Sequence, residues 1–258
     1  MGKTAKKRGR KKDKREKDRH GKGQGPKKSR HNTSAPMTEL EDAGQTAIAT
    51  HGSSTPVAPT SVVDFWFDPI SPWAWLTSRW LLDVQEVRPV KLVWHLLSMS
   101  VMGDGADTSE DFRAQLDAGW APARVALAVA EQFGQEQLGA FYTALGTRIH
   151  MRDEGYSRQV LEAALADVGL PPELADLGYT GDNDDALRQS HRDATQLVGF
   201  ESGPPLIQID GAAFFGPVLS PPPRGEEAGQ IFDAIARLDA FSGFHELTRA
   251  RPEEPILE

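Results

Sequence analysis

The sequence is most informative at residues 61–75, which read SVVDFWFDPISPWAW. Residues 61–67 are β-branched and aromatic, a composition that predicts a buried strand. The Asp-Pro pair at 68–69 ends this strand. Ser71 followed by Pro72 is typical of a helix start, because serine caps free amides and proline suits the first helical position. Apolar residues then recur at helical spacing, so a strand should lead directly into a helix.

The next part of the chain completes a strand–helix–strand unit and then turns helical. Residues 90–97 predict a second strand, parallel to the first because a helix connects the two. Helical periodicity then dominates for about a hundred residues. It predicts four longer helices, at 110–133, 136–150, 157–168 and 182–198. Pro122 should break or kink the first of these, because proline lacks the backbone N–H that a helix interior uses.

The last part of the chain returns to strands. Residues 206–209 and 212–215 predict two short strands, and Asp210-Gly211 between them is a hairpin signal. A closing amphipathic helix is expected at 226–238. The order therefore predicts an α/β domain over residues 61–258, with a mixed sheet and an all-helical insertion at about 104–200.

The amino-acid composition excludes several kinds of functional site. The 258-residue chain contains no cysteine, which excludes a disulfide framework, a cysteine-based zinc site and a thiol nucleophile of its own. No run approaches the roughly 18 apolar residues that span a bilayer, so we expect no membrane association. No cluster with metal-ligand spacing stands out, and no metal site is predicted.

Residues 1–60 predict a disordered basic tail and linker. Residues 1–30 carry a net charge of +12 and the remainder −20. Such a tail can tether nucleic acid through counterion release. It can equally be a solvated tail, or lie upstream of a true start at Met37, and we favour these readings because the acidic remainder repels a polyanion. The tail has no hydrophobic segment typical of a secretory signal, so we expect a cytoplasmic protein.

Several stretches together resemble a known family. They are residues 65–75, 77–80, 142–150, 187–191 and 213–220. From about Ser61 onward the chain resembles the DsbA-like branch of the thioredoxin superfamily, and most closely the group of mycothiol-dependent nitroreductases and DsbA-type oxidoreductases. The resemblance implies a thioredoxin-like fold. It also implies a cleft for a small thiol such as mycothiol, or for a planar small molecule.

The resemblance breaks at the residues that carry the family's chemistry. Family members have Cys-x-x-Cys where this chain has Ser71 and Ala74. The helix start lowers the pKa of the first cysteine, and the second cysteine resolves the mixed disulfide. Serine is far too weak an acid to be ionised there, and alanine cannot resolve a disulfide. We therefore predict that this oxidoreductase homologue does not perform dithiol/disulfide exchange.

Two interpretations of the site remain open. In the first, the chain keeps only a cleft, with Pro72, Trp73, Pro204 and Pro205 as ligand-binding candidates and Ser71 as a helix cap. The family places a cis-proline at the position of Pro205, and Trp73 is suited to stacking on a planar ligand. The second starts from the similarity of residues 71–75 to the Ser-Pro turn of kappa-class glutathione transferases and 2-hydroxychromene-2-carboxylate isomerases. It implies a transferase or isomerase in which Ser71 stabilises a cofactor thiolate. Neither predicts a tightly bound cofactor.

Overall fold

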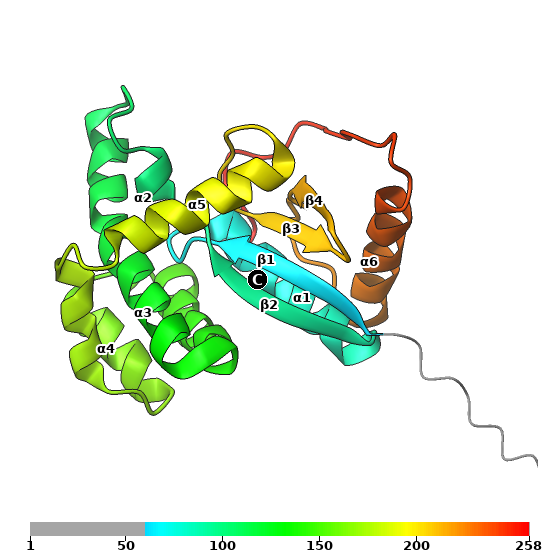
Figure 1. Cartoon of the computed structure of the whole chain (residues 1–258). Helices are drawn as coiled ribbons and strands as arrows, with labels where there is room; N and C mark the ends of the chain where they lie inside the picture. The colour runs from blue at the N-terminus through cyan, green and yellow to red at the C-terminus, as the bar shows by residue number, and fades with distance from the viewer. Residues whose placement is uncertain (1–59, 258) are drawn as a thin grey trace, which may run out of the picture. The chain divides into compact units, whose positions relative to one another are not determined.

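The computed structural model describes residues 60–257. The predicted basic tail and linker lie outside these residues, apart from Thr60. The sheet contains four strands, β1 (Ser61–Phe67), β2 (Val90–Leu96), β3 (Leu206–Ile209) and β4 (Ala212–Phe215), in the order β2-β1-β3-β4 (Figure 1). Strand β1 runs parallel to β2, whereas β3 is antiparallel to both of its neighbours. The predicted parallel pair and hairpin are therefore confirmed.

Alternation along β1 divides the interior between two faces of the sheet. Val63, Phe65 and Phe67 are fully buried in the main core. Trp66 points to the opposite face and packs with Ala194 in a second, smaller cluster. Successive side chains of a strand point to opposite faces, so a strand that is buried on both sides is almost continuously apolar. In β1 this holds only near the end of the strand, because on the second face Trp66 is buried, Asp64 is half-buried and Val62 is exposed.

Within residues 60–257, helices follow β1, β2 and β4. They are α1 (Pro72–Val87), α2 (Met99–Met102), α3 (Glu110–Gly146), the π-helical turn η1 (Thr147–Met151), α4 (Arg158–Asp167), the 3-10 helix η2 (Pro172–Tyr179), α5 (Asp184–Val198) and α6 (Gly225–Asp239). All of those from α2 to α5 lie between β2 and β3 in the chain. The β-α-β and β-β-α halves thus form a thioredoxin-like α/β fold with a helical insertion.

Helix α3 corrects one prediction. It does not break at Pro122, which is buried within the helix. Proline removes a single backbone hydrogen bond, and the packing of the surrounding buried residues keeps the helix together. The irregular position is Gly134, whose φ of 84° and ψ of −175° suit glycine because it has no Cβ. The predicted interruption between residues 133 and 136 is therefore correct, whereas the break at Pro122 is wrong.

Helix α1 is fixed firmly to its neighbours. The indole N–H of Trp80 donates to the carbonyl oxygen of Ala228 in α6 at 3.0 Å. At its C-terminal end, Arg88 forms ion pairs with Glu226 and Asp233 of α6. These contacts hold α1 against α6, and they thereby fix the position of its first turn. Between residues 60 and 257, no helix has the length and apolar character needed to cross a membrane.

Candidate functional site

Ser71 begins α1 and is almost completely enclosed. Its hydroxyl oxygen accepts the N–H of Ala74 at 3.2 Å, and its carbonyl oxygen accepts the N–H of Trp75 at 3.0 Å. Only 3% of the residue is exposed. The predicted helix cap is confirmed. A role of Ser71 in stabilising a thiolate stays a prediction.

The first turn of α1 keeps one backbone amide free. Pro72 has no N–H, and the N–H groups of Ala74 and Trp75 are used by Ser71. The N–H of Trp73 has no hydrogen-bond partner among residues 60–257. The first turn also contains no acidic residue. A helix start of this kind attracts negative charge, because free amides and the helix dipole both favour an anion.

A buried carboxyl group anchors the loop that precedes α1. Asp68 has no solvent exposure, and its two oxygens accept the N–H of Ile70 at 2.9 Å and the N–H of Met99 at 2.6 Å. Burial raises the pKa of Asp68 to about 6, and the two backbone N–H groups oppose part of that rise. The contact with Met99 ties the loop to the start of α2.

A histidine fixes the same loop from the helical insertion. His150 Nε2 lies 2.9 Å from the carbonyl oxygen of Pro69, so this nitrogen carries the proton and donates it. The imidazole also stacks on Trp75, with ring centroids 5.6 Å apart. Burial lowers the pKa of His150 to about 4, and the side chain is therefore neutral at physiological pH. His150 thus acts here as an anchor for the backbone.

The predicted proline loop meets this helix start at one end of the sheet. The Pro204–Pro205 peptide bond is cis. Pro205 immediately precedes Leu206, which pairs with Trp66 near the end of β1, so the proline lies beside the point where β1 enters the α1 loop. The N–H of Gly216, directly after β4, donates to the carbonyl oxygen of Pro205 at 2.8 Å. This second loop is tied to α1, because the hydroxyl of Thr77 donates to the carbonyl oxygen of Pro217 at 2.8 Å. Pro204 is half-buried and Pro205 is buried.

Trp73 is the predicted site residue with a partner from a distant part of the chain. It is half-buried, whereas the nearby Trp75 and Trp80 belong to the core. The guanidinium carbon of Arg251 lies 4.8 Å from the centroid of the Trp73 ring. A segment beyond α6 therefore passes over the start of α1.

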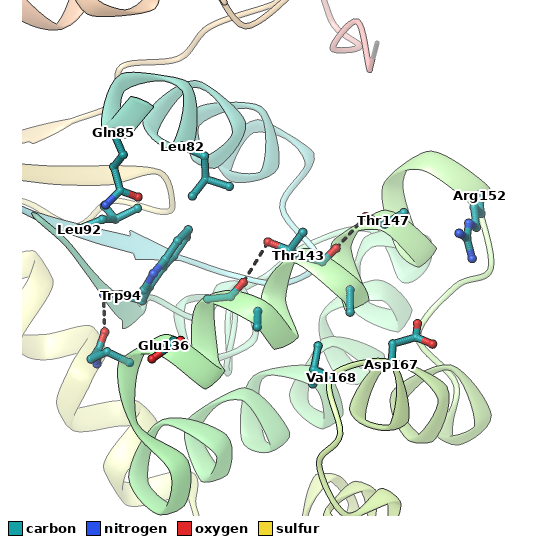
Figure 2. Close-up of a pocket in the computed structure, with 14 residues that line it drawn as sticks. Leu82, Gln85, Leu92, Trp94, Glu136, Thr143, Thr147, Arg152, Asp167 and Val168 are labelled. Carbon is teal, nitrogen blue, oxygen red and sulfur yellow. Dashed lines mark hydrogen bonds between the residues drawn. The ribbon is translucent and has the colours of Figure 1, made fainter. Parts of the chain in front are cut away.

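A hollow of about 790 Å³ lies away from this helix start. It is bordered by Leu82 and Gln85 of the later turns of α1, by Leu92 and Trp94 of β2, and by α3, η1 and the end of α4 (Figure 2). The predicted site residues do not line it. The expected ligand cleft at the start of α1 therefore stays a prediction.

Sequence reasoning missed two residues of this site. Asp68 could have been suspected, because an acid directly after a strongly apolar strand, and next to proline, is well placed to bind loop amides. Arg251 gave no signal, because it lies in a polar segment without periodicity. Both residues make their contacts with groups far along the chain, Asp68 with Met99 and Arg251 with Trp73.

Comparisons with known proteins find a similar curated sequence and similar solved structures. A curated relative, the uncharacterized protein Rv2286c of Mycobacterium tuberculosis (strain ATCC 25618 / H37Rv), is 27% identical over 197 residues, which cover 76% of this chain and 84% of that protein. The crystal structure of a thioredoxin-like oxidoreductase from Silicibacter pomeroyi DSS-3 is 22% identical, with a TM-score of 0.44, and covers 70% of this chain and 88% of its own. The oxidoreductase DsbA from Xylella fastidiosa is 18% identical, with a TM-score of 0.44, at 72% and 90% coverage.

The family of this chain is shown by a match to a protein-family model. Residues 70–249 match the Rv2466c-like model, which is described as mycothiol-dependent nitroreductase Rv2466c. The match includes the α1 turn, the helical insertion and the proline loop, and it spans more than half of the chain. This chain therefore belongs to the Rv2466c-like family of mycothiol-dependent nitroreductases, with serine and alanine at residues 71 and 74.

Proposed function

We propose that the protein binds a small thiol such as mycothiol, or a planar small molecule, at the start of α1 and performs no dithiol chemistry of its own. The observation that carries the proposal is the first turn of α1. It has a serine cap, a free N–H at Trp73 and no acidic residue within the turn itself. Neither partner is a macromolecule. A cytoplasmic location is part of the proposal, because small thiols are kept reduced there.

The loss of dithiol chemistry follows from the two residues at the helix start. Disulfide exchange needs a thiolate that attacks and a second thiol that resolves the mixed disulfide. Ser71 and Ala74 supply neither, and the sequence contains no cysteine elsewhere. A reactive sulfur at this site must therefore belong to the ligand.

The residues present are suited to a thiol ligand. A thiolate is stabilised by amide donors and by the positive end of a helix dipole. Trp73 offers both a free N–H and a half-buried ring at this end of α1. When bound, the thiol would supply the nucleophilic sulfur. The protein would bind the ligand and favour the charged form of that sulfur.

A second candidate function gives Ser71 a direct part. Its oxygen already accepts the N–H of Ala74, whereas its hydroxyl proton has no acceptor among residues 60–257. One hydroxyl can accept and donate at the same time, so Ser71 could cap α1 and donate to a ligand thiolate. This would support a serine-assisted thiol transferase or isomerase. It ranks second because 3% exposure leaves the ligand little access to the hydroxyl.

Titration calorimetry with mycothiol and with nitrobenzene tests the first proposal. We expect at least one of them to bind the wild-type protein, and no turnover of a disulfide substrate. Absence of binding by both ligands would refute the retained site, and disulfide turnover would refute the loss of redox chemistry.

A pair of serine variants tests the second proposal. Ser71→Ala and Ser109→Ala each remove a helix cap, since the hydroxyl of Ser109 accepts the N–H of Phe112 at 3.3 Å at the start of α3. Both should lower stability by about 1 kcal/mol. If Ser71 assists a thiolate, only Ser71→Ala should slow mycothiol conjugation, by about tenfold or more, which corresponds to about 1.4 kcal/mol. Equal rates in the two variants would exclude the serine-assisted reaction.

A further inference from the structure

We propose that residues 241–257, here called the C-terminal strap, form an autoinhibitory cover over Trp73 that a ligand must lift. The proposal rests on the proposed function, because it assumes that Trp73 belongs to the ligand site. Figure 1 shows the strap, coloured red, leaving α6 and turning back toward the middle of the domain. The match to the family model ends at residue 249, so it does not account for the contact made by Arg251.

The strap is anchored near both of its ends. At the first anchor, the rings of Phe244 and Phe214 of β4 lie 5.9 Å apart. At the second, the N–H of Ile256 donates to the hydroxyl of Ser220 at 2.7 Å, and Leu257 packs against the main core. These anchors keep the segment between them close to the domain even when that segment moves.

The middle of the strap is held far more weakly. Its residues from 245 to 254 are exposed, and Leu247 is 83% exposed. In this stretch, Arg251 contacts α1, with its guanidinium carbon 4.8 Å from the centroid of the Trp73 ring. Arg251 forms no ion pair with any acid among residues 60–257. A segment with few buried contacts opens readily, so one cation–π contact is the latch of the strap.

The latch and a planar ligand compete for the same aromatic surface. A ring face that carries a guanidinium group cannot also stack on a planar molecule. Residues on either side of Trp73 in the chain are fixed, since Ser71 and Ala74 form the helix cap and are buried. The strap is therefore the part that has to move when a ligand stacks on this face of Trp73. An exposed cation–π contact is weak, and its loss should shift the closed-to-open ratio by about two- to fivefold.

Two arginines in the strap provide a matched pair of variants. Arg251→Ala removes the latch, whereas Arg249→Ala removes an exposed arginine that contacts no aromatic ring among residues 60–257. The first readout needs no ligand and is the rate of cleavage after the exposed Glu246 by a glutamate-specific protease. We expect cleavage to become about two- to fivefold faster in Arg251→Ala and to stay unchanged in Arg249→Ala. Equal cleavage rates in both variants and the wild type would overturn the latch.

The second readout is the affinity of a neutral planar probe, nitrobenzene, measured by calorimetry. Arg251→Ala should tighten binding by about two- to fivefold, with no change in Arg249→Ala. Faster cleavage without tighter binding would overturn autoinhibition. If nitrobenzene bound none of the three proteins, the stacking of a planar ligand on Trp73 would be refuted, and autoinhibition with it, whereas binding of mycothiol would still support the proposed function. Cleavage rates would then test the latch alone, which a rise confined to Arg251→Ala supports and an unchanged rate overturns.

Discussion

The two ends of helix α1 have opposite surroundings. At its start, Ser71 and Asp68 are buried, and backbone amides use their side-chain oxygens. Toward its other end, Leu82 and Gln85 border a hollow of about 790 Å³ (Figure 2). The family's sequence motif therefore marks the tightly packed end of the helix, and the open volume lies at the other. A ligand at the start of α1 requires a covering group to move, whereas one in the hollow does not.

Restoring both cysteines would have the largest effect at the packed end. Ser71→Cys combined with Ala74→Cys supplies an attacking and a resolving thiol at a helix start that favours a thiolate. We expect the double variant to catalyse disulfide exchange, which the wild-type chain cannot do. The measurement is the rate of thiol oxidation with a disulfide substrate.

The single variants serve as controls for this gain of function. Ser71→Cys alone should form a mixed disulfide without turning over, because Ala74 cannot resolve it. Ala74→Cys alone lacks the thiol at the cap position. A folded double variant without activity would mean that the packed end admits no substrate to residue 71, and the site would have to be sought elsewhere.

Asp68 should make the packed end sensitive to pH. Its pKa is raised from an unfolded value near 4 to about 6, so the folded protein holds a proton that the unfolded chain has lost. The free energy of unfolding should therefore fall as the pH rises from 4 to 6. Asp68→Asn cannot titrate, and the free energy of unfolding of this variant minus that of wild type should rise by about 2 kcal/mol over this range.

Urea denaturation at several pH values between 4 and 7.5 measures this difference. Asp117→Asn, at an exposed position in α3, is the control for the same change of side chain outside the packed end. A flat difference for Asp68→Asn would mean that its carboxyl group ionises as easily in the folded protein as in the unfolded chain. The start of α1 would then be better hydrated than its burial indicates.

Local patterns allowed much of this fold to be predicted from the sequence. The bounds of β1, β3 and β4 coincide with those expected, because each strand is a short, mostly apolar run that is followed directly by aspartate or glycine. The cis peptide bond at Pro205 was expected from the family resemblance and is present. Signals of this kind lie within a few residues of the feature that they predict.

Features that depend on distant contacts could not be predicted in this way. Pro122 reads as a helix breaker, yet buried packing around it keeps α3 continuous. The carboxylate of Asp68 accepts the N–H of Met99, and the carbonyl oxygen of Pro69 accepts a hydrogen bond from His150. The latch on Trp73 comes from an exposed segment beyond the last helix. In each case the partner is chosen by the folded chain and leaves no local pattern.

Two glycines of α3, Gly146 and Gly139, each lie against a tryptophan ring. Trp75 is near the start of α1, and Trp94 is beside the hollow at its other end. A Cβ at Gly146 would lie 2.3 Å from the ring of Trp75, and one at Gly139 would lie 2.8 Å from Nε1 of Trp94. The Trp75 ring is enclosed by His150 and by Arg79, whose guanidinium carbon lies 4.0 Å from the ring centroid. Trp94 borders the hollow and has room to shift.

We therefore expect unequal costs for the same substitution. Gly146→Ala should lower the free energy of unfolding by about 2 kcal/mol, because the enclosed ring cannot move away. Gly139→Ala should be close to neutral, since the helix gains up to about 1 kcal/mol from alanine and Trp94 can yield. Urea denaturation measures both. Equal losses would show that the hollow does not relieve crowding at Trp94.

The smallest expected loss of stability concerns a hydrogen bond at the open end. Gln135 Oε1 accepts the N–H of Trp94 at 2.7 Å, as Asp68 accepts that of Met99 at the packed end. Gln135→Ala should lower the free energy of unfolding by only about 0.5–1 kcal/mol, because water in the hollow can replace the lost acceptor. Hydrogen exchange at the Trp94 amide should rise at the same time. A loss of 2 kcal/mol or more, measured by urea denaturation, would mean that the amide is left dry. The two ends of α1 would then be equally closed to water, and the hollow would give no easier access to a ligand than the start of the helix.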